Sequence, residues 1–350
     1  MPTKNLIIFR IDGRGAIGRR SMERCLYLAT AHEQRGGRAH FALNERDDEI
    51  ESILGQRGIG VSSIDSTIGS MADCEELLEV ATSIGASAIV IDGAVFESKY
   101  LETSAQSLFT AVIDDGGERT LPVQLVINSG FAADERFYTC RADSSLLLGP
   151  KFQVLDPEIT RWAKPTMTEV GRIPRYYISS IDEHNTARIL NSMPSPTQTS
   201  ILCVSGPIDC PILNAATRDA CAQGYTIEHV GPSAVADTLF YCDAAVVCPD
   251  SPIGLLAYLG VPSLVIANDS DRTREVRRLA EEEATRSIMP MDELSDNELS
   301  SSLSEFFEDS KQRQMQGERL SALVDGNGTT RILDCIRESL RPNLRLLDAA

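Results

Sequence analysis

Glycine and arginine residues near the start of the chain form the pattern best suited to chemistry. Gly13, Gly15 and Gly18 have the G-x-G-x-x-G spacing and lie between an apolar run and a helix-period segment. Such glycines let the backbone approach a phosphate, and a helix N-terminus then offers unpaired N–H groups and positive dipole charge. Arg19 and Arg20 add full charges. The pattern favours contact with a phosphate or a nucleotide-sugar, and a plain βα turn and a dinucleotide site are the alternatives.

Two carboxylates near this turn have candidate roles. Asp12 precedes the first glycine and is the nearest candidate for a general base. Glu45 follows the next predicted strand, where an acidic residue would bind the ribose of a dinucleotide, but it lies further downstream than usual. Arg10 and Asp12 are also unusual for the first strand of a dinucleotide-binding βαβ unit, which normally stays apolar up to the first glycine. Dinucleotide binding is therefore the weaker alternative.

Short apolar runs alternate with helix-period segments, which is typical of parallel βαβ units. In the first half we expect strands over 5–10, 39–43, 59–62, 88–91, 110–113 and 123–127 and helices over 17–34, 47–54, 74–84 and 100–108. In the second half we expect strands over 200–205, 225–229, 244–248 and 263–267 and helices over 212–222, 234–239, 253–259, 273–284, 296–307 and 331–340. Each half therefore predicts a Rossmann-like α/β domain.

The composition changes between the two halves. Residues 157–199 are rich in proline, serine and threonine and form the best linker candidate, with room for a helix around 181–193. The predicted organisation is an N-terminal Rossmann-like domain over 1–156, the linker, a C-terminal Rossmann-like domain over 200–328, and a C-terminal helix and tail over 329–350. A length of 350 residues fits two domains.

Composition and charge restrict the classes of function. Apolar residues make up 42% and charged residues 24% of the chain, as in ordinary globular proteins. The net charge of −18 opposes binding to nucleic acid or to an anionic membrane. No apolar stretch has the roughly 18 residues that a membrane helix needs. The apolar run near the N-terminus is too short for the core of a signal peptide. Four of the nine cysteines lie in or beside apolar runs, and none fits a zinc or CxxC spacing, so we expect no metal site and a protein of the reducing cytoplasm. We also expect no cofactor.

Four stretches, in order along the chain, resemble one protein family. They are Arg10-x-Asp12 with Gly18 and Arg24-Cys25, then Val112-Ile113-Asp114-Asp115 before Arg119, then Leu148–Phe152, and then Leu256–Pro262. Ser205-Gly206 echoes a further turn of that family. On these motifs the chain, up to about residue 271, resembles the UDP-sugar hydrolases of pseudaminic acid biosynthesis and the related spore-coat polysaccharide biosynthesis proteins.

The resemblance implies a glycosyltransferase-B-like (GT-B-like) fold, with two Rossmann-like domains facing each other across a cleft that holds the ligand. It also implies that the C-terminal domain binds the nucleotide and that the N-terminal loop reaches the pyrophosphate and the sugar. The reaction would be attack of water on a UDP-deoxyamino sugar with release of UDP. Asn268 falls near the family's N-Q pair if a short deletion precedes it.

The sequence departs from this family at several functional positions. Ser21 stands where the family has its loop histidine, and serine has no titratable group near neutral pH that could replace imidazole as a base. Leu255 replaces the glutamate expected on the ribose, and Pro252 removes one phosphate-binding N–H. The family's D-H-Y becomes Asp92-Gly93-Ala94. These departures indicate altered or lost catalysis.

The favoured interpretation is a nucleotide-sugar hydrolase homologue in surface-polysaccharide or flagellin-glycan nonulosonic acid biosynthesis. The alternatives are a GT-B-type glycosyltransferase and a non-catalytic ligand-binding or scaffold protein. The catalytic candidates are Asp12 and Ser21, and the substrate- or nucleotide-binding candidates are Gly13, Gly15, Gly18, Arg19, Arg20, Arg24, Asp114, Gly206, Ser251 and Asn268. For Asp114, a capped acidic turn is an alternative to ligand contact.

Overall fold

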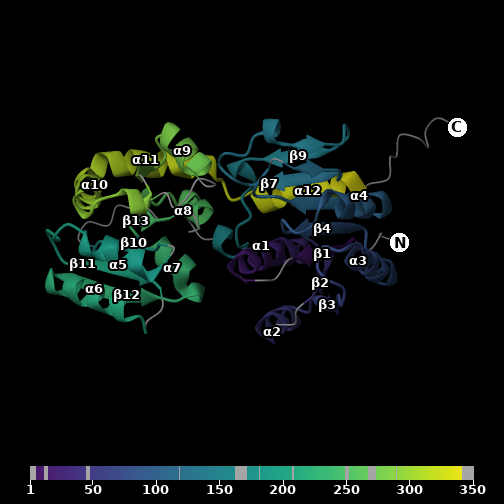
Figure 1. The fold of residues 1–350 in the computed structure, drawn as a ribbon, viewed down its shortest axis with the longest axis horizontal. Helices are drawn as coiled ribbons and strands as arrows, with labels where there is room; N and C mark the ends of the chain where they lie inside the picture. Colours follow the sequence, from purple (N-terminus) through teal and green to yellow (C-terminus); the bar gives the residue numbers. More distant parts are fainter. Residues whose placement is uncertain are drawn as a thin grey trace. The chain divides into compact units, whose positions relative to one another are not determined.

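The chain folds into two compact units, shown in Figure 1. A computed structural model describes residues 5–11, 15–44, 48–117, 119–161, 172–180, 182–206, 209–248, 252–266, 273–288 and 290–340. The first unit comprises residues 1–161 and 326–350, and the second comprises residues 162–325. We refer to them as the N-terminal and the C-terminal domain and describe each by itself.

The N-terminal domain is built on a parallel sheet. Its strands are β1 (Leu6–Ile11), β2 (Arg38–Leu43), β3 (Gly60–Ser63), β4 (Ala88–Asp92), β5 (Phe109–Ile113), β7 (Leu125–Asn128) and β9 (Ser145–Leu148), and β6 (Thr120–Leu121) pairs separately with β8 (Thr139–Cys140). The strand order is β3-β2-β1-β4-β5-β7-β9, with every neighbouring pair parallel. From β1 the chain adds strands first on one side, as β2 and β3, and then on the other, beginning with β4. This change of side creates a topological switch point between the carboxyl ends of β1 and β4, where open α/β sheets bind ligands.

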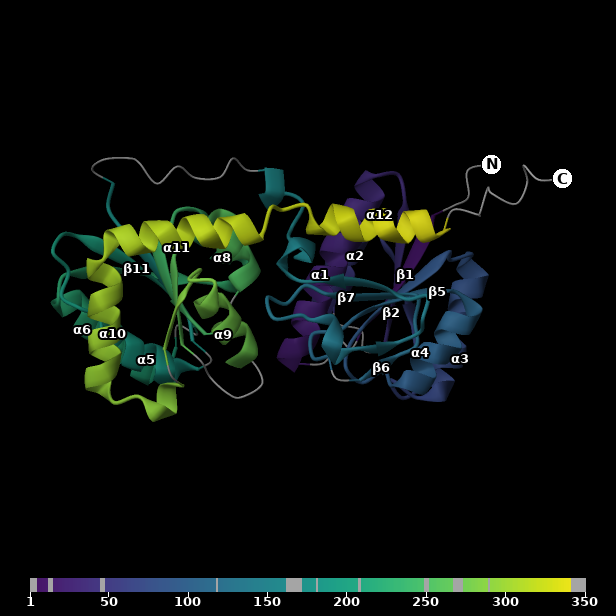
Figure 2. The ribbon, with the colours of Figure 1, turned by 90° about the horizontal axis from the view of Figure 1, so that it is seen from above.

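Helices cover both faces of this sheet. They are α1 (Gly15–Gln34), α2 (Asp48–Gln56), α3 (Met71–Ile84), α4 (Ser98–Ser107) and α12 (Gly328–Leu340). Helices α1, α2 and α12 cover one face of the sheet, and α3 and α4 cover the other (Figure 2). Their side chains form one core cluster with each face of the strands. Strands β1 and β4 are buried along their whole length and are apolar except for one charged residue near the carboxyl end of each, Arg10 and Asp92.

The last helix belongs to the N-terminal domain although it follows the whole C-terminal domain in sequence. Gly328, the first residue of α12, packs so closely that an added Cβ would lie 2.2 Å from the carbonyl oxygen of Gln153. The Nη1 of Arg331 donates a 2.8 Å hydrogen bond to the carbonyl of Lys151. The helix predicted over 331–340 therefore begins earlier, at the residue that allows this contact.

The C-terminal domain repeats the same topology. Its strands are β10 (Arg175–Ile178), β11 (Ser200–Ser205), β12 (Tyr225–Val230), β13 (Ala244–Val247), β14 (Ser263–Ile266) and β15 (Arg286–Ile288). Their order is β12-β11-β10-β13-β14-β15, again with parallel pairs. A second switch point therefore lies between the carboxyl ends of β10 and β13.

Seven helices are described around this second sheet. They are α5 (Glu183–Asn191), α6 (Pro211–Ala222), α7 (Val235–Phe240), α8 (Ile253–Leu259), α9 (Thr273–Glu281), α10 (Asp296–Glu308) and α11 (Ser310–Leu323). Side chains of α5, α6 and α10 form a core cluster with one face of the strands. None of the helices described in either domain is both long and apolar enough to cross a membrane.

Three elements of the C-terminal domain are missing from the sequence prediction, and the shortest of them is the edge strand β15. Residues 175–191, which the composition places in a linker, contain strand β10 and helix α5. The helix was expected around 181–193, but the strand was not, and β10 lies between β11 and β13 in the middle of the sheet. The strand has only four residues and follows a proline-rich stretch, so it lacks the long apolar run of the other strands. Helix α11 is also missing from the prediction because its buried residues are Gln316, Gly317 and Leu320 rather than a regular apolar stripe.

Candidate functional site

Polar side chains gather at the carboxyl edge of the N-terminal sheet, beside its switch point. Asp92 is the last residue of β4 and lies opposite Ile11, the last residue of β1. The side chain of Asp92 is almost completely buried, with 1% exposed. Because a buried carboxylate is costly without charged or hydrogen-bonding partners, Asp92 must find them within the protein.

Helix α1 supplies the partners of Asp92. Ser21 Oγ donates a hydrogen bond of 3.0 Å to Oδ1. Arg24 donates from Nε to Oδ2 and from Nη2 to Oδ1, each over 2.7 Å, which is a bidentate ion pair. Cys25 Sγ lies 3.6 Å from Oδ2, and burial raises the pKa of this thiol well above its ordinary value. Since donors occupy both oxygens, Asp92 anchors α1 to the switch point and is not a free base.

Arg24 also reaches the next strand of the sheet. Its Nη1 and Nη2 donate to the carboxylate of Asp115, which follows β5, over 2.7 Å and 3.0 Å. The side chain of Arg24 is 18% exposed and that of Asp115 is 59% exposed, so this second ion pair faces solvent. Burial lowers the pKa of the Arg24 guanidinium, but the charges of Asp92 and Asp115 outweigh it and raise the pKa well above the ordinary value. Arg24 is therefore permanently cationic.

Asp114 organises the turn after β5. Its Oδ1 accepts a 2.7 Å hydrogen bond from Arg119 Nε, and its Oδ2 accepts one of 2.6 Å from the backbone N–H of Gly117. The Nη1 of Arg119 also donates to the carbonyl of Phe96 over 3.0 Å, which joins this turn to the one after β4. The arrangement is the capped acidic turn considered as the alternative, and ligand contact by Asp114 stays a prediction.

The glycine-rich segment leads directly into α1. Gly15 is the first residue of this helix and Gly18 lies in its first turn, together with the backbone of Arg19. Arg20 is exposed one residue before the buried Ser21. The βα context predicted for the glycine pattern is therefore present from residue 15 onward.

Other predicted site residues fall outside the described part of the chain or in the other domain. Asp12, Gly13, Ser251 and Asn268 lie outside the described residues. Gly206 follows β11 in the C-terminal domain with a φ of +153°, and an added Cβ would lie 3.1 Å from Leu213 Cδ2. Glycine therefore suits the turn from β11 toward α6. Ligand binding by these residues stays a prediction.

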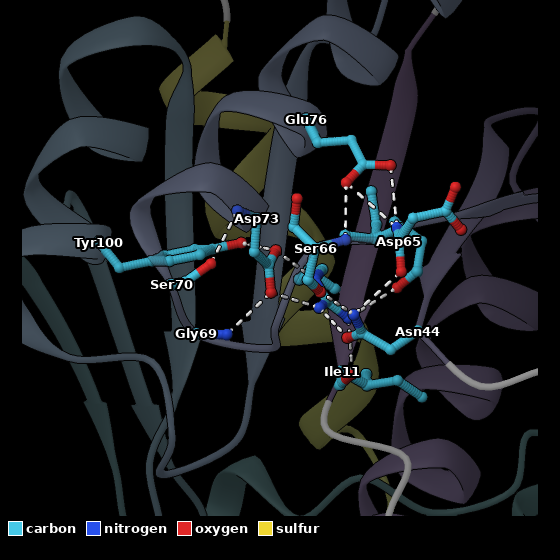
Figure 3. Close-up of polar contacts among 12 residues, drawn as sticks. Ile11, Asn44, Asp65, Ser66, Gly69, Ser70, Asp73, Glu76 and Tyr100 are labelled. Atoms are coloured by element: carbon cyan, nitrogen blue, oxygen red, sulfur yellow. Dashed lines mark hydrogen bonds and ion pairs between the residues drawn. The ribbon is translucent and has the colours of Figure 1, made fainter.

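Beside the same edge of the N-terminal sheet lies a buried polar network that sequence reasoning missed (Figure 3). Arg10 of β1 donates from Nε to Asp73 Oδ1 over 3.0 Å and from Nη2 to Asp73 Oδ2 over 2.6 Å. The hydroxyl of Tyr100 donates to the same carboxylate over 2.8 Å. The available signal was the arginine in an apolar strand, because a buried charge requires a partner. Its partner lies 63 residues away and has no motif.

The histidines do not form a catalytic group with these residues. His32 Nε2 lies 2.8 Å from the carbonyl oxygen of Asn5, and His40 Nε2 lies 2.9 Å from Ser62 Oγ. Burial lowers the pKa of both imidazoles. Across the described residues, no cluster of three or more histidine, cysteine, aspartate or glutamate side chains has the arrangement of a metal site.

Comparison with known proteins supports the architecture. No protein-family model matches the sequence, and no curated protein matches it. The chain is similar in structure to MurG from Acinetobacter baumannii, with a TM-score of 0.70, 11% identity, and coverage of 95% of this chain and 99% of that one. It is also similar to CalG4, the calicheamicin glycosyltransferase, with a TM-score of 0.61, 11% identity, and coverage of 98% and 100%.

A third similar structure contains a nucleotide. It is the spinosyn rhamnosyltransferase SpnG complexed with thymidine diphosphate, with a TM-score of 0.58, 13% identity, and coverage of 94% of this chain and 100% of that one. These similarities extend over both domains and confirm the predicted fold class, two Rossmann-like domains of the GT-B glycosyltransferase fold. At such low identity they establish the fold alone.

Proposed function

We propose that this protein is a nucleotide-sugar-dependent enzyme that transfers a glycosyl group. The observation that carries the proposal is that α1, with Gly15 and Gly18 in its first turn, begins just after β1, beside the switch point of the N-terminal sheet. Helix N-termini and guanidinium groups both favour phosphate oxygens, and open α/β sheets bind ligands at this edge. Two of the similar structures are glycosyltransferases, one of them complexed with a nucleoside diphosphate.

In this proposal the N-terminal domain stabilises the charge that develops on the leaving nucleoside diphosphate. The groups involved are the backbone amides near Gly15 and Gly18 and the guanidinium groups of Arg19 and Arg20. Arg24 acts indirectly, because its nitrogen atoms already donate to Asp92 and Asp115. Preorganised donors of this kind usually supply the largest single contribution to catalysis. Asp12 is the candidate base that accepts the proton of the acceptor hydroxyl. In the C-terminal domain, Gly206, Ser251 and Asn268 are the candidate nucleotide contacts.

The position of Ser21 favours transfer over hydrolysis. Ser21 is 2% exposed and its hydroxyl donates to Asp92, so this group neither accepts a proton from water nor faces solvent. Hydrolysis by the histidine-dependent route that the resembled family implies therefore lacks its base. A glycosyltransferase has less need of that base, because positioning and charge stabilisation of the leaving group carry most of the catalysis.

Hydrolysis of a UDP-deoxyamino sugar in nonulosonic acid biosynthesis is the second candidate. It is supported by contacts between two of the motifs on which the family resemblance rests, and by Asp92, the aspartate that remains of the family's D-H-Y. Arg24, Asp92 and Asp115 come from distant parts of the sequence and meet through ion pairs at one sheet edge. This convergence is consistent with a site inherited from that family.

Ligand binding and product release test the two candidates. Thermal shift measurements with UDP, UDP-N-acetylglucosamine, CMP and NAD identify the class of ligand, because a ligand that binds only the folded state raises the melting temperature. UDP release from UDP-N-acetylglucosamine is then measured with and without a panel of sugar acceptors. Release that requires an acceptor is the expected result.

Each other outcome has a definite meaning. Release of UDP at the same rate without an acceptor contradicts transfer and supports hydrolysis. A shift with NAD alone supports a dinucleotide enzyme, and a shift with none of these nucleotides or sugar nucleotides contradicts both candidates and supports a scaffold role.

A further inference from the structure

The side chain of Arg10 is fully buried and bonded through all three of its nitrogen atoms. Besides its two hydrogen bonds to Asp73, it donates from Nη1 to the carbonyl oxygens of Ile11 and Ala42, over 3.0 Å and 3.2 Å. Its Nη2 also donates to the side-chain oxygen of Asn44. One guanidinium thus fixes the end of β1 and the residues at the end of β2.

The partners of Arg10 extend these contacts to the turn between β3 and α3. Asp73 Oδ2 accepts a 2.8 Å hydrogen bond from the backbone N–H of Gly69, in addition to the one that its Oδ1 accepts from Tyr100. Asn44 Nδ2 donates to the carbonyl oxygen of Ser66 over 2.7 Å. Figure 3 shows the Asp73 and Asn44 side chains beside Gly69 and Ser66 of this turn. The network therefore joins three successive segments at the carboxyl edge of the sheet.

Stability alone does not explain such a network. Removing two charges from water costs about as much as their attraction returns, so a buried ion pair commonly adds little net stability compared with neutral side chains. The network is also directly connected to the candidate site, because Ile11, whose carbonyl Arg10 holds, lies opposite Asp92 in the sheet. A planar guanidinium with several fixed donors is well suited to hold carbonyl groups in one geometry.

We propose that Arg10 and Asp73 are positioning residues, which set the end of β1, the end of β2 and the β3–α3 turn for ligand binding at the carboxyl edge. The part of this proposal that concerns ligand binding rests on the proposed function. The geometric part does not, because it concerns only the conformation of the three segments.

The test compares the single variant Arg10→Met with the double variant Arg10→Met/Asp73→Asn. The single variant leaves a buried carboxylate without its cation, whereas the double variant removes both charges and keeps an amide oxygen as an acceptor for Tyr100. The matched control is Arg136→Gln/Asp134→Asn, which removes an ion pair at the surface of the same domain. Melting temperature, hydrogen exchange of the amides over 64–68, and kcat/KM for UDP release are measured for each protein.

We expect the single variant to lose more than about 8 °C of melting temperature and the double variant to lose at least about 4 °C less than the single variant, since the unpaired buried charge is then absent although the groups that Arg10 bonded still lack that donor. In the double variant we expect at least tenfold faster exchange over 64–68, with unchanged exchange in β4 and β5. We also expect kcat/KM to fall roughly 10- to 100-fold, because small displacements at a site have effects of this size. The surface control should match the wild-type protein in all three measurements.

Two results would overturn the proposal. If the double variant loses as much melting temperature as the single variant, or does not fold, the pair contributes net stability. If it folds with wild-type exchange over 64–68, the pair does not position the turn. A wild-type protein that turns over no nucleotide-sugar contradicts the proposed function instead, and the exchange measurement still decides whether Arg10 and Asp73 position these segments.

Discussion

The hydroxyl of Ser21 donates a 3.0 Å hydrogen bond to the carboxylate of Asp92, and the two residues are 2% and 1% exposed. In the hydrolase family that the sequence resembles, a catalytic histidine stands at the position of Ser21. Here the side chain at that position binds a carboxylate that Arg24 already neutralises. Ser21 is therefore part of the attachment of α1 to the sheet, and the proposed reaction would rely on other groups.

The first prediction concerns the contribution of Ser21 to turnover. Because its hydroxyl is not a base, Ser21→Ala should change kcat for UDP release by less than about threefold, whereas loss of a general base typically costs about 10²- to 10⁴-fold. Steady-state kinetics with UDP-N-acetylglucosamine measure this. Asp12→Asn is the comparison and should lose at least about 10²-fold. A loss of that size in Ser21→Ala would contradict the positioning role and restore Ser21 as a catalytic candidate.

The second prediction concerns the ion pair between Arg24 and Asp92. Arg24→Met leaves the buried Asp92 carboxylate without its cation, so the free energy of unfolding should fall by about 2–4 kcal/mol. Adding Asp92→Asn should recover more than about 1 kcal/mol of that loss, because neighbouring charges are coupled. Urea unfolding of the wild type, both single variants and the double variant gives the coupling energy. Simple additivity of the two single changes would show that the pair is not coupled in solution.

Sequence patterns were sufficient for most of the fold because the parallel strands are buried on both faces. Runs such as residues 88–91 and 200–205 leave no ambiguity about their structure, and the glycine pattern correctly places a helix after β1. Strand β10 was not predictable in this way, since four residues of mixed polarity after a proline carry no periodic signal. Its place in the sheet is decided by contacts with β11 and β13, which are distant in sequence.

The candidate site was predictable only in part. Arg24 and Asp114 were identified through motifs, but their partners depend on which strands are adjacent. The role of Asp92 follows from its place opposite Ile11, and that pairing joins residues about eighty positions apart. Asp73 and Tyr100 carry no recognisable motif, so a long-range contact alone reveals them as partners of Arg10.

The third prediction concerns the packing of α12 on the N-terminal domain. An added Cβ at Gly328 would lie 2.2 Å from the oxygen of Gln153 and 2.6 Å from the carbonyl carbon of Phe152, both of which are backbone atoms. Gly328→Ala should therefore lower the free energy of unfolding by about 1–3 kcal/mol or more, as overpacking does. Urea unfolding measures the change.

Gly55 provides a control for this prediction within the same domain. It lies in α2, and an added Cβ there would meet no atom within 4 Å. Gly55→Ala should be neutral or stabilising by up to about 1 kcal/mol, because alanine has the higher helix propensity. Equal effects at Gly328 and Gly55 would show that α12 does not pack closely against the segment that contains Gln153.

The fourth prediction concerns acid stability and His32. Its Nε2 donates to the carbonyl of Asn5, and an added Cβ at Gly37 would lie 2.2 Å from the same nitrogen atom, so the ring is closely packed. Burial is the main cause that lowers the pKa of His32 below its ordinary value of 6.5. The unfolded chain therefore takes up a proton at a higher pH than the folded protein does.

It follows that His32 contributes stability that is complete above about pH 6.5 and is lost as the pH falls toward the lower pKa of the folded state. The urea midpoint of the wild-type protein should therefore decrease between pH 7.5 and pH 5.0 by more than that of His32→Gln, whose amide can still donate to Asn5. Identical pH dependence in the wild type and His32→Gln would mean that the imidazole is not held neutral by burial.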